Sequence, residues 1–159
     1  MEEGGQEAGI PVYGTGNLLV LNDREEILLG RRSERSKYEP GRWNLPGGLR
    51  DFEEPLIQTA LRETQEEFGL RLEASGLLFF RSYRCIYRDR IVEASYHLAR
   101  IEGRPPLVMC EREFCEGGFF PLAEATSWEL AFRQEIILRD LLASGRLSNL
   151  LPAAGQQAL

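Results

Sequence analysis

Four charged residues at short spacing, Arg62, Glu63, Glu66 and Glu67, are the part of the sequence best suited to chemistry. In a helix, side chains three and four residues apart lie on one face, so Glu63 would neighbour both Glu66 and Glu67. Like charges at this spacing repel by about 0.2–0.5 kcal/mol per pair. Arg62 can offset part of this repulsion by pairing with Glu66, and a divalent cation would offset more. The pattern predicts a metal-binding cluster on the exposed side of a helix.

Magnesium is the ion that suits such a cluster. It takes oxygen ligands, keeps several waters and is commonly held by one or two carboxylates together with substrate phosphates. A glutamate-rich helix face is usually plain solvated surface, so the carboxylates alone do not decide between the two interpretations. The residues before and after them do.

The helix that must position these carboxylates is predicted over residues 53–68. Pro55 is tolerated in a first turn, and Gly69 stands where a helix C-terminus is expected. The apolar residues repeat at helical spacing along one stripe, which comprises Ile57, Ala60, Leu61, Thr64 and Phe68. We expect this stripe to pack on the core and the glutamates to face away from it.

Strand-like segments flank this helix. Residues 12–21 and 26–30 are expected to form one hairpin, residues 77–86 and 91–101 a second hairpin, and residues 119–122 a short strand. A second amphipathic helix is predicted over residues 128–142. Strands and helices that do not alternate regularly predict a mixed β-sheet flanked by helices.

The 159 residues fit one domain. We expect a flexible segment over residues 1–10, the domain over residues 11–145 and a loose tail over residues 146–159. The net charge of -6 argues against broad nucleic-acid binding, which usually leaves a basic footprint. No apolar stretch approaches the ~20 residues that span a membrane. Three cysteines without a metal motif indicate idle thiols in a reducing compartment, so we expect a cytoplasmic location.

The spacing around the glutamates is more specific than the glutamates themselves. Gly48 is followed by five residues and Glu54, then by seven residues and Arg62-Glu63, then by two residues and Glu66-Glu67. This resembles the Nudix signature, and every fixed position is met. Only Thr64 departs, where a bulky aliphatic residue is usual. The preceding Trp-Asn-Leu-Pro-Gly-Gly run at residues 43–48 is also similar to the family's lead-in.

The chain is therefore identified as a member of the Nudix hydrolase superfamily, of the MutT-like kind. The resemblance implies an α/β/α sandwich with a mixed β-sheet between helices. It implies Mg2+-dependent hydrolysis of a diphosphate linkage in a nucleoside diphosphate linked to another moiety, with Mn2+ as the alternative ion. The implied partner is a nucleotide-derived small molecule, and the family leaves room for a homodimer.

The resemblance also assigns roles to single residues. Glu63, Glu66 and Glu67 would bind the divalent ions, and one of them would act as a base toward water. Gly47 would add a backbone carbonyl to the metal, and Arg62 would orient a glutamate by an ion pair. Glu54 would stabilise the junction between loop and helix.

Many family members use a further glutamate from a later loop as base or ligand. It often lies about six residues before a short strand with aromatic residues, which here selects Glu113. Glu111 and Glu116 are close rivals, and all three could be solvated loop charges. Arg31 and Arg32 are among the arginines that could contact phosphates.

Two other functions remain open. One is a non-catalytic Nudix domain that senses nucleotides, although such domains often lose a signature glutamate. The other is a related metal-dependent isoprenoid diphosphate isomerase, which would want an active-site cysteine such as Cys85 or Cys110. A histidine-based triad is poorly supported, because His97 is the single histidine and lies in a strand-like run. Tyr83, Tyr87 and Trp43 could stack a base, but aromatic residues in strands are more often part of the core.

Overall fold

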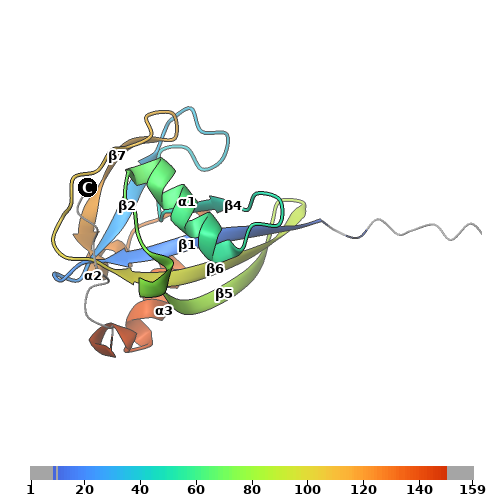
Figure 1. Cartoon of the computed structure of the whole chain (residues 1–159). Helices are drawn as coiled ribbons and strands as arrows, with labels where there is room; N and C mark the ends of the chain where they lie inside the picture. Colours follow the sequence, from blue (N-terminus) through green and yellow to red (C-terminus); the bar gives the residue numbers. More distant parts are fainter. Residues whose placement is uncertain (1–8, 10, 150–159) are drawn as a thin grey trace, which may run out of the picture.

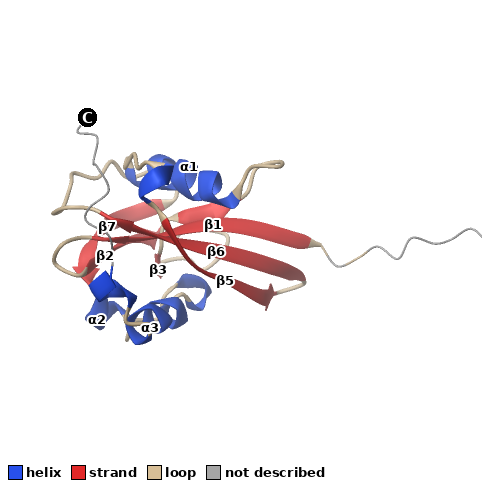
Figure 2. Cartoon of the chain, turned by 60° about the horizontal axis from the view of Figure 1, so that its bottom comes forward, coloured by secondary structure: helices blue, strands red, loops and turns tan. Residues whose placement is uncertain are grey.

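The computed structural model describes residue 9 and residues 11–149, which form a mixed β-sheet with helices on both faces (Figures 1 and 2). The strands run in the order β3-β2-β1-β6-β5, with β4 paired to β1 and β7 paired to β2. Their bounds are β1 (Val12–Leu21), β2 (Glu26–Arg32), β3 (Trp43–Asn44), β4 (Gly47–Leu49), β5 (Leu78–Tyr87), β6 (Arg90–Arg100) and β7 (Phe114–Pro121). The predicted sandwich with a mixed sheet is confirmed.

One helix covers one face of the sheet and two helices cover the other (Figure 2). The single helix is α1 (Leu56–Phe68), and the opposite pair is α2 (Leu122–Ala125) and α3 (Glu135–Ala143). Short 3-10 turns lie at Ala74–Gly76, Ala131–Arg133 and Arg146–Asn149. None of the helices within the described ranges combines the length and the apolar character that a membrane crossing requires.

The neighbours of β1 determine where α1 can sit. β1 runs parallel to β6 over ten residue pairs, but it meets β2 only at Leu21↔Ile27. The space left beside β1 is taken by β4, which pairs antiparallel from Thr15↔Leu49 to Asn17↔Gly47. The glycine-rich strand β4 therefore lies next to β1 and beneath α1.

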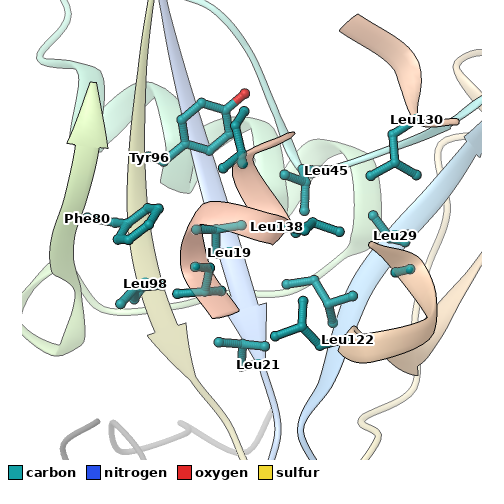
Figure 3. Packing of buried hydrophobic residues seen from close by; sticks show 14 residues of the cluster. Leu19, Leu21, Leu29, Leu45, Phe80, Tyr96, Leu98, Leu122, Leu130 and Leu138 are labelled. Atoms are coloured by element: carbon teal, nitrogen blue, oxygen red, sulfur yellow. The ribbon is translucent and has the colours of Figure 1, made fainter. Parts of the chain in front are cut away.

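Two hydrophobic clusters hold the layers together, and β1 contributes to both because successive side chains of a strand point to opposite faces. Leu19 and Leu21 join the cluster between the sheet and α3, which Figure 3 shows with Leu138 and Leu29. Leu18 and Val20 join the cluster beneath α1, whose large buried members are Phe68 and Phe114.

A glycine lets α1 approach the sheet closely. A Cβ atom added at Gly16 would lie 2.1 Å from the carbonyl oxygen of Leu56 and 2.8 Å from the amide nitrogen of Ala60. The backbone of the helix thus touches the backbone of β1. This contact fixes the height of α1 above β4.

The structure corrects the predicted bounds of both helices. α1 begins at Leu56, because Glu53 has a positive φ of 55° and Pro55 occupies the N-cap with an extended ψ of 139°. The segment predicted as one helix over residues 128–142 is interrupted, because Phe132 and Arg133 both have positive φ. Only Glu135–Ala143 is α-helical there.

The predicted N-terminal segment and C-terminal tail lie mostly outside the described residues. Residues 146–149 were expected to belong to a loose tail, but they form a 3-10 turn whose Leu147 packs against the cluster between the sheet and α3. The rest of that tail, residues 150–159, lies outside the described residues. So do residues 1–8 and 10 of the predicted flexible N-terminal segment.

Candidate functional site

Three carboxylates meet beside the C-terminal half of α1. Glu63 and Glu67 come from the helix, and Glu113 comes from the turn that precedes β7. One oxygen atom of each lies within 4.8 Å of the others. Glu67 is buried, Glu63 is partly buried and Glu113 is exposed, so the cluster opens to solvent on the Glu113 side. We call these three residues the carboxylate cluster.

Backbone hydrogen bonds connect the turn that carries Glu113 to the end of α1. The amide of Cys110 donates to the carbonyl oxygen of Glu67 at 3.0 Å, and the amide of Glu113 donates to the carbonyl oxygen of Cys110, also at 3.0 Å. On its other side, the amide of Ser33 donates to the carbonyl oxygen of Glu113 at 2.8 Å. Glu113 is therefore tied both to the helix and to the residue that follows β2.

The two glycines of β4 make room for the glutamates. A Cβ atom added at Gly48 would lie 2.6 Å from Cδ of Glu63, so only a glycine lets this carboxylate rest on the strand. The amide of Gly47 donates to Oε1 of Glu67 at 2.9 Å. Gly47, which was predicted to offer its carbonyl, thus touches the cluster through its N–H.

Arg62 holds the acidic residues around it in fixed positions. Its Nε and Nη2 contact the two oxygens of Glu54 at 2.9 and 3.0 Å, and Nη2 also donates to the carbonyl oxygen of Leu49 at 3.2 Å. Its Nη1 contacts Glu63 at 3.0 Å and Glu66 at 3.3 Å. The hydrogen bonds from Arg62 and Thr59 lower the pKa of Glu54 to about 2, so Glu54 stays ionised.

Burial works against ionisation inside the cluster. It raises the pKa of Glu67 well above the usual value, and the charges of Glu63 and Glu113 act in the same direction. Burial also raises the pKa of Glu63, although the Arg62 guanidinium opposes this. The hydrogen bond from the Gly47 amide is little compensation for a buried carboxylate among like charges. A divalent cation would supply it, and three carboxylate donors fit Mg2+ or Mn2+.

One sequence-based expectation about these residues is wrong. The three helix glutamates do not share an exposed side, because Glu67 is only 3% exposed and turns toward Gly47. Glu66 is exposed and faces Arg62 instead of the cluster. The spacing held a signal for this, since Glu67 lies seven residues after Ala60 and three after Thr64, both on the buried stripe.

The remaining candidates lie elsewhere. Glu116, a rival of Glu113, contacts Arg31 at 3.4 Å. His97 packs edge-on against Phe79, and burial lowers its pKa. Neither Cys85 nor Cys110 is part of the carboxylate cluster, and all three cysteines are free thiols.

A chain of polar side chains that leads toward the site, two of them buried, was not predicted from the sequence. Nη1 of Arg32 donates to Oδ1 of Asn44 at 2.9 Å, and Nδ2 of Asn44 donates to Oε1 of Gln134 at 2.9 Å. The same oxygen of Gln134 accepts from the amide of Leu45 at 2.8 Å. Asn44 and Gln134 are 90 residues apart, so no local pattern could reveal this contact.

The outer side of α1 carries a separate hollow of about 590 Å3. Gln58, Gln65 and Arg71 are among its lining residues, together with Glu54 and Arg62. Because no member of the carboxylate cluster lines it, we do not assign it to the same site.

Comparisons with known proteins point to one family. The family model of the NUDIX domain matches residues 12–141. The chain is 39% identical over 75 residues to "m7GpppN-mRNA hydrolase NUDT17" of Xenopus laevis. The aligned region covers 43% of this chain and 25% of the relative. It is 43% identical over 65 residues to "Putative 8-oxo-dGTP diphosphatase 3" of Mycobacterium tuberculosis, which covers 38% of this chain and 30% of the relative. The chain thus spans less than a third of the length of these two relatives.

Solved structures share the fold. The MutT protein from Methanosarcina mazei Go1 superposes with a TM-score of 0.74 at 22% identity, covering 86% of this chain and 97% of that one. The NUDIX domain of Shewanella oneidensis NrtR, solved in complex with ADP ribose, superposes with a TM-score of 0.73 at 20% identity, covering 87% and 92%. At these identities the likeness concerns the fold alone.

Proposed function

Since the chain belongs to the Nudix family, as the match over residues 12–141 shows, we propose that it hydrolyses a diphosphate linkage in a nucleoside diphosphate linked to another moiety. The observation that carries this proposal is the carboxylate cluster of Glu63, Glu67 and Glu113, whose two helix members lie against the glycines of β4. The names of the two curated relatives, a hydrolase and a diphosphatase, support the same reaction type.

The residues of the cluster would hold Mg2+, with Mn2+ as the alternative. When bound, the ion neutralises charge on the diphosphate and lowers the pKa of a coordinated water. Glu63, Glu67 and Glu113 supply carboxylate oxygens, and the carbonyl of Gly47 is the proposed backbone ligand. Glu66 is proposed as a ligand of a further ion. It contacts the same Nη1 of Arg62 as Glu63 does, so the two carboxylates lie on the same side of the helix.

The chain's own groups then have separate tasks. Water forms a bond to one phosphorus while the bond from that phosphorus to the bridging oxygen breaks, and the proton of the water passes to a carboxylate. We assign this proton transfer to Glu113, because it is the exposed member of the cluster and tethered at its backbone. Arg62 keeps Glu63 and Glu54 in place, which makes it a positioning residue.

The two alternatives receive less support. An isomerase would need a cysteine thiol among the acidic side chains. Cys110 bonds to Glu67 and Glu113 through its backbone, but neither its thiol nor that of Cys85 belongs to the group of possible ligand atoms. A nucleotide sensor needs no intact cluster, whereas here every signature glutamate is present. We also propose a cytoplasmic location, a homodimer and no broad binding of nucleic acids. Light scattering after size-exclusion chromatography tests the dimer.

A substrate panel tests the reaction. The purified protein is incubated with nucleoside triphosphates, ADP-ribose, NADH, dinucleoside polyphosphates and sugar nucleotides, with Mg2+, Mn2+ or a chelator, and products are separated by chromatography. We expect metal-dependent cleavage within the diphosphate of at least one class. Retained nucleotide binding without any cleavage would favour the sensor.

Variants connect that activity to the site. Glu113→Gln should lose most activity and keep its fold, because the side chain is exposed and its backbone contacts remain. Glu124→Gln, an exposed glutamate in the first turn of α2, is the matched control and should behave like the wild type. Full turnover of Glu113→Gln would refute the assignment of the base.

A further inference from the structure

Gln134 is a buried polar side chain on the face of the sheet opposite α1. It lies directly before α3 and is only 3% exposed. Its Oε1 accepts from the amide of Leu45 at 2.8 Å and from Nδ2 of Asn44 at 2.9 Å, and its Nε2 donates to the hydroxyl of Tyr96 at 3.2 Å. An amide bonded at both ends holds its neighbours in one arrangement, because a shift would leave a buried polar group unpaired.

The backbone is strained directly before Gln134. Phe132 has φ 55° and ψ 25°, and Arg133 has φ 56°. The left-handed region is an outlier for a bulky residue, and such strain is often found at functional sites. Here it lies next to the side chain that joins α3 to the segment after β3, which suggests that the position of this side chain matters for more than packing.

The segment after β3 leads from Gln134 to the carboxylate cluster. The amide of Leu45 is bonded to Gln134, and two residues later the amide of Gly47 donates to Oε1 of Glu67 at 2.9 Å. Between them, the carbonyl oxygen of Pro46 accepts a hydrogen bond from β1 at 3.0 Å. Each of these three consecutive residues thus has one backbone group fixed, the first by Gln134 and the last by the cluster. The position of Gly47 therefore depends on the bond between Gln134 and Leu45.

Asn44 provides a second connection between Gln134 and the cluster. Its Nδ2 faces Gln134, so its Oδ1 is free to accept from Nη1 of Arg32 at 2.9 Å. Burial lowers the pKa of Arg32, and the charges of Glu67 and Glu113 oppose this effect. The guanidinium group is thus close enough to the acidic residues to feel their charge. Gln134 holds it in place by fixing the orientation of the Asn44 amide.

We propose that Gln134 is a positioning residue of the metal site, which holds residues 45–47 against Glu67 from the opposite face of the sheet. The inference rests on the proposed function, because it concerns the site that would hold Mg2+ or Mn2+. Gln134 bonds to Leu45 and Asn44 and to no member of the carboxylate cluster, so it acts through the backbone. Loss of a group that orients metal ligands typically weakens metal affinity by about 10- to 100-fold.

The first test measures binding of Mn2+ alone, without substrate, by the electron paramagnetic resonance signal of the free ion. Gln134→Met has a similar length but offers no amide, and it should raise the Kd for Mn2+ about 10-fold or more. Gln134→Glu keeps an acceptor for Leu45 and Asn44, so it should rescue the affinity to within about 3-fold of wild type.

Tyr96→Phe is the matched control for the first test. It removes the bond at the other end of the Gln134 amide and leaves Leu45 and Asn44 bonded. It should lower Tm, because a buried hydrogen bond is lost, but keep the Kd for Mn2+ within about 2-fold of wild type. Equal Kd values for Tyr96→Phe and Gln134→Met would overturn the positioning role, because a purely structural residue would give this result.

A second measurement follows the Gly47 amide without any metal. Hydrogen exchange is recorded by NMR in the presence of a chelator, with the amides of β6 as the reference for global stability. Gln134→Met should speed exchange at Gly47 about 10-fold relative to that reference, and Tyr96→Phe should not. If Gln134→Met does not fold, Gln134→Asn takes its place, because its shorter side chain cannot reach Leu45. Unchanged exchange at Gly47 would overturn the inference.

These measurements separate the inference from the proposed hydrolysis. If wild type hydrolyses nothing but the Gln134 variants show the expected Mn2+ affinities and exchange rates, the reaction is wrong and the positioning role stands. If wild type cleaves nucleotides while Gln134→Met changes neither quantity, the reaction stands and the positioning role is wrong. If wild type binds no Mn2+, the metal site is wrong, and the role of Gln134 in it is wrong as well.

Discussion

Glu67 combines properties that rarely occur together in one side chain. It belongs to the motif that was identified by spacing, yet it is buried and bonded to the amide of Gly47. The motif alone predicted that this residue takes part in chemistry. The prediction that its side chain faces solvent was wrong. The position of Glu67 around the helix was measured from an apolar stripe that included the partly exposed Ile57 and Leu61.

Glu67→Gln should separate activity from stability. The amide keeps the shape and the acceptor for Gly47 but removes a buried charge among like charges. We expect activity to fall about 100-fold or more. In chelator, the free energy of unfolding should rise by about 1 kcal/mol, because the desolvation cost of the carboxylate is gone. Urea denaturation measures this, and a clear loss of stability would show that the carboxylate is compensated within the protein.

Arg62→Lys should damage activity without unfolding the protein. A lysine cannot make the two parallel bonds to Glu54 while also reaching Glu63, because its charge is a single point. Loss of such a supporting contact typically weakens metal affinity or activity by about 10- to 100-fold. Steady-state rates across a metal titration measure the effect. The control is Arg71→Lys on the exposed segment after α1, and equal behaviour of both variants would contradict the positioning role.

At the scale of elements, the position of α1 was predictable and its N-terminus was not. The apolar repeat and Gly69 located the helix and its end, where Gly69 has φ 70°. The start depended on Glu53 taking a positive φ, which no helical periodicity reveals. The break at Phe132 was missed for a similar reason, because the segment around it is in contact with β3, which lies far away in the sequence.

The close approach of α1 to β1 makes a second prediction at this scale. Gly16→Ala would place a Cβ atom against the backbone of the helix, which cannot give way, so we expect a loss of about 3 kcal/mol in the free energy of unfolding. Gly14→Ala is the matched control in the same strand. Its nearest contact is Cδ2 of Leu56 at 3.1 Å, the far end of a side chain, and it should lose less than about 1 kcal/mol. Equal losses in chemical denaturation would contradict the backbone contact.

For the whole molecule, the residue spacing from Gly48 to Glu67 predicted more about the family and the fold than the amino-acid composition did. The resemblance is confirmed by the family match, and with it came the mixed sheet and the order of its elements. Contacts across the fold could not be derived locally. The path from Arg32 through Asn44 to Gln134 joins three segments, and only folding brings them together.

The stability of the whole molecule should depend on pH through Glu26. This buried side chain accepts from Arg104 Nε at 2.8 Å and from Asn22, and these bonds lower the pKa of Glu26 from 4.5 to about 2. Because the pKa of Glu26 is lower in the folded protein than in the unfolded chain, ionised Glu26 stabilises the fold at pH values above the unfolded-state pKa of about 4.5. This contribution is lost as the pH falls from about 4.5 to about 2. We therefore expect a fall in Tm across that interval.

Arg104→Ala isolates this contribution. It should lower the free energy of unfolding at pH 7, because the buried carboxylate loses a partner. The difference from wild type should shrink as the pH falls from about 4.5 to about 2, because Glu26 is protonated first in the unfolded chain and then in the folded protein, where the protonated side chain needs no cation. Arg84→Ala, which breaks an exposed pair with Glu93, is the control and should change little. A difference that stays constant down to pH 2 would contradict the assignment.

The parallel pairing of β1 with β6 has a consequence for how the protein is made. Val12 pairs with Ile91, about 80 residues later, whereas β1 meets its sequence neighbour β2 at a single position. During synthesis the central strand therefore leaves the ribosome long before its main partner exists, and its apolar residues stay open to chaperones. Contacts this distant in sequence also slow folding. We expect the nascent chain to remain protease-sensitive until β6 has emerged and then to acquire resistance in one cooperative step.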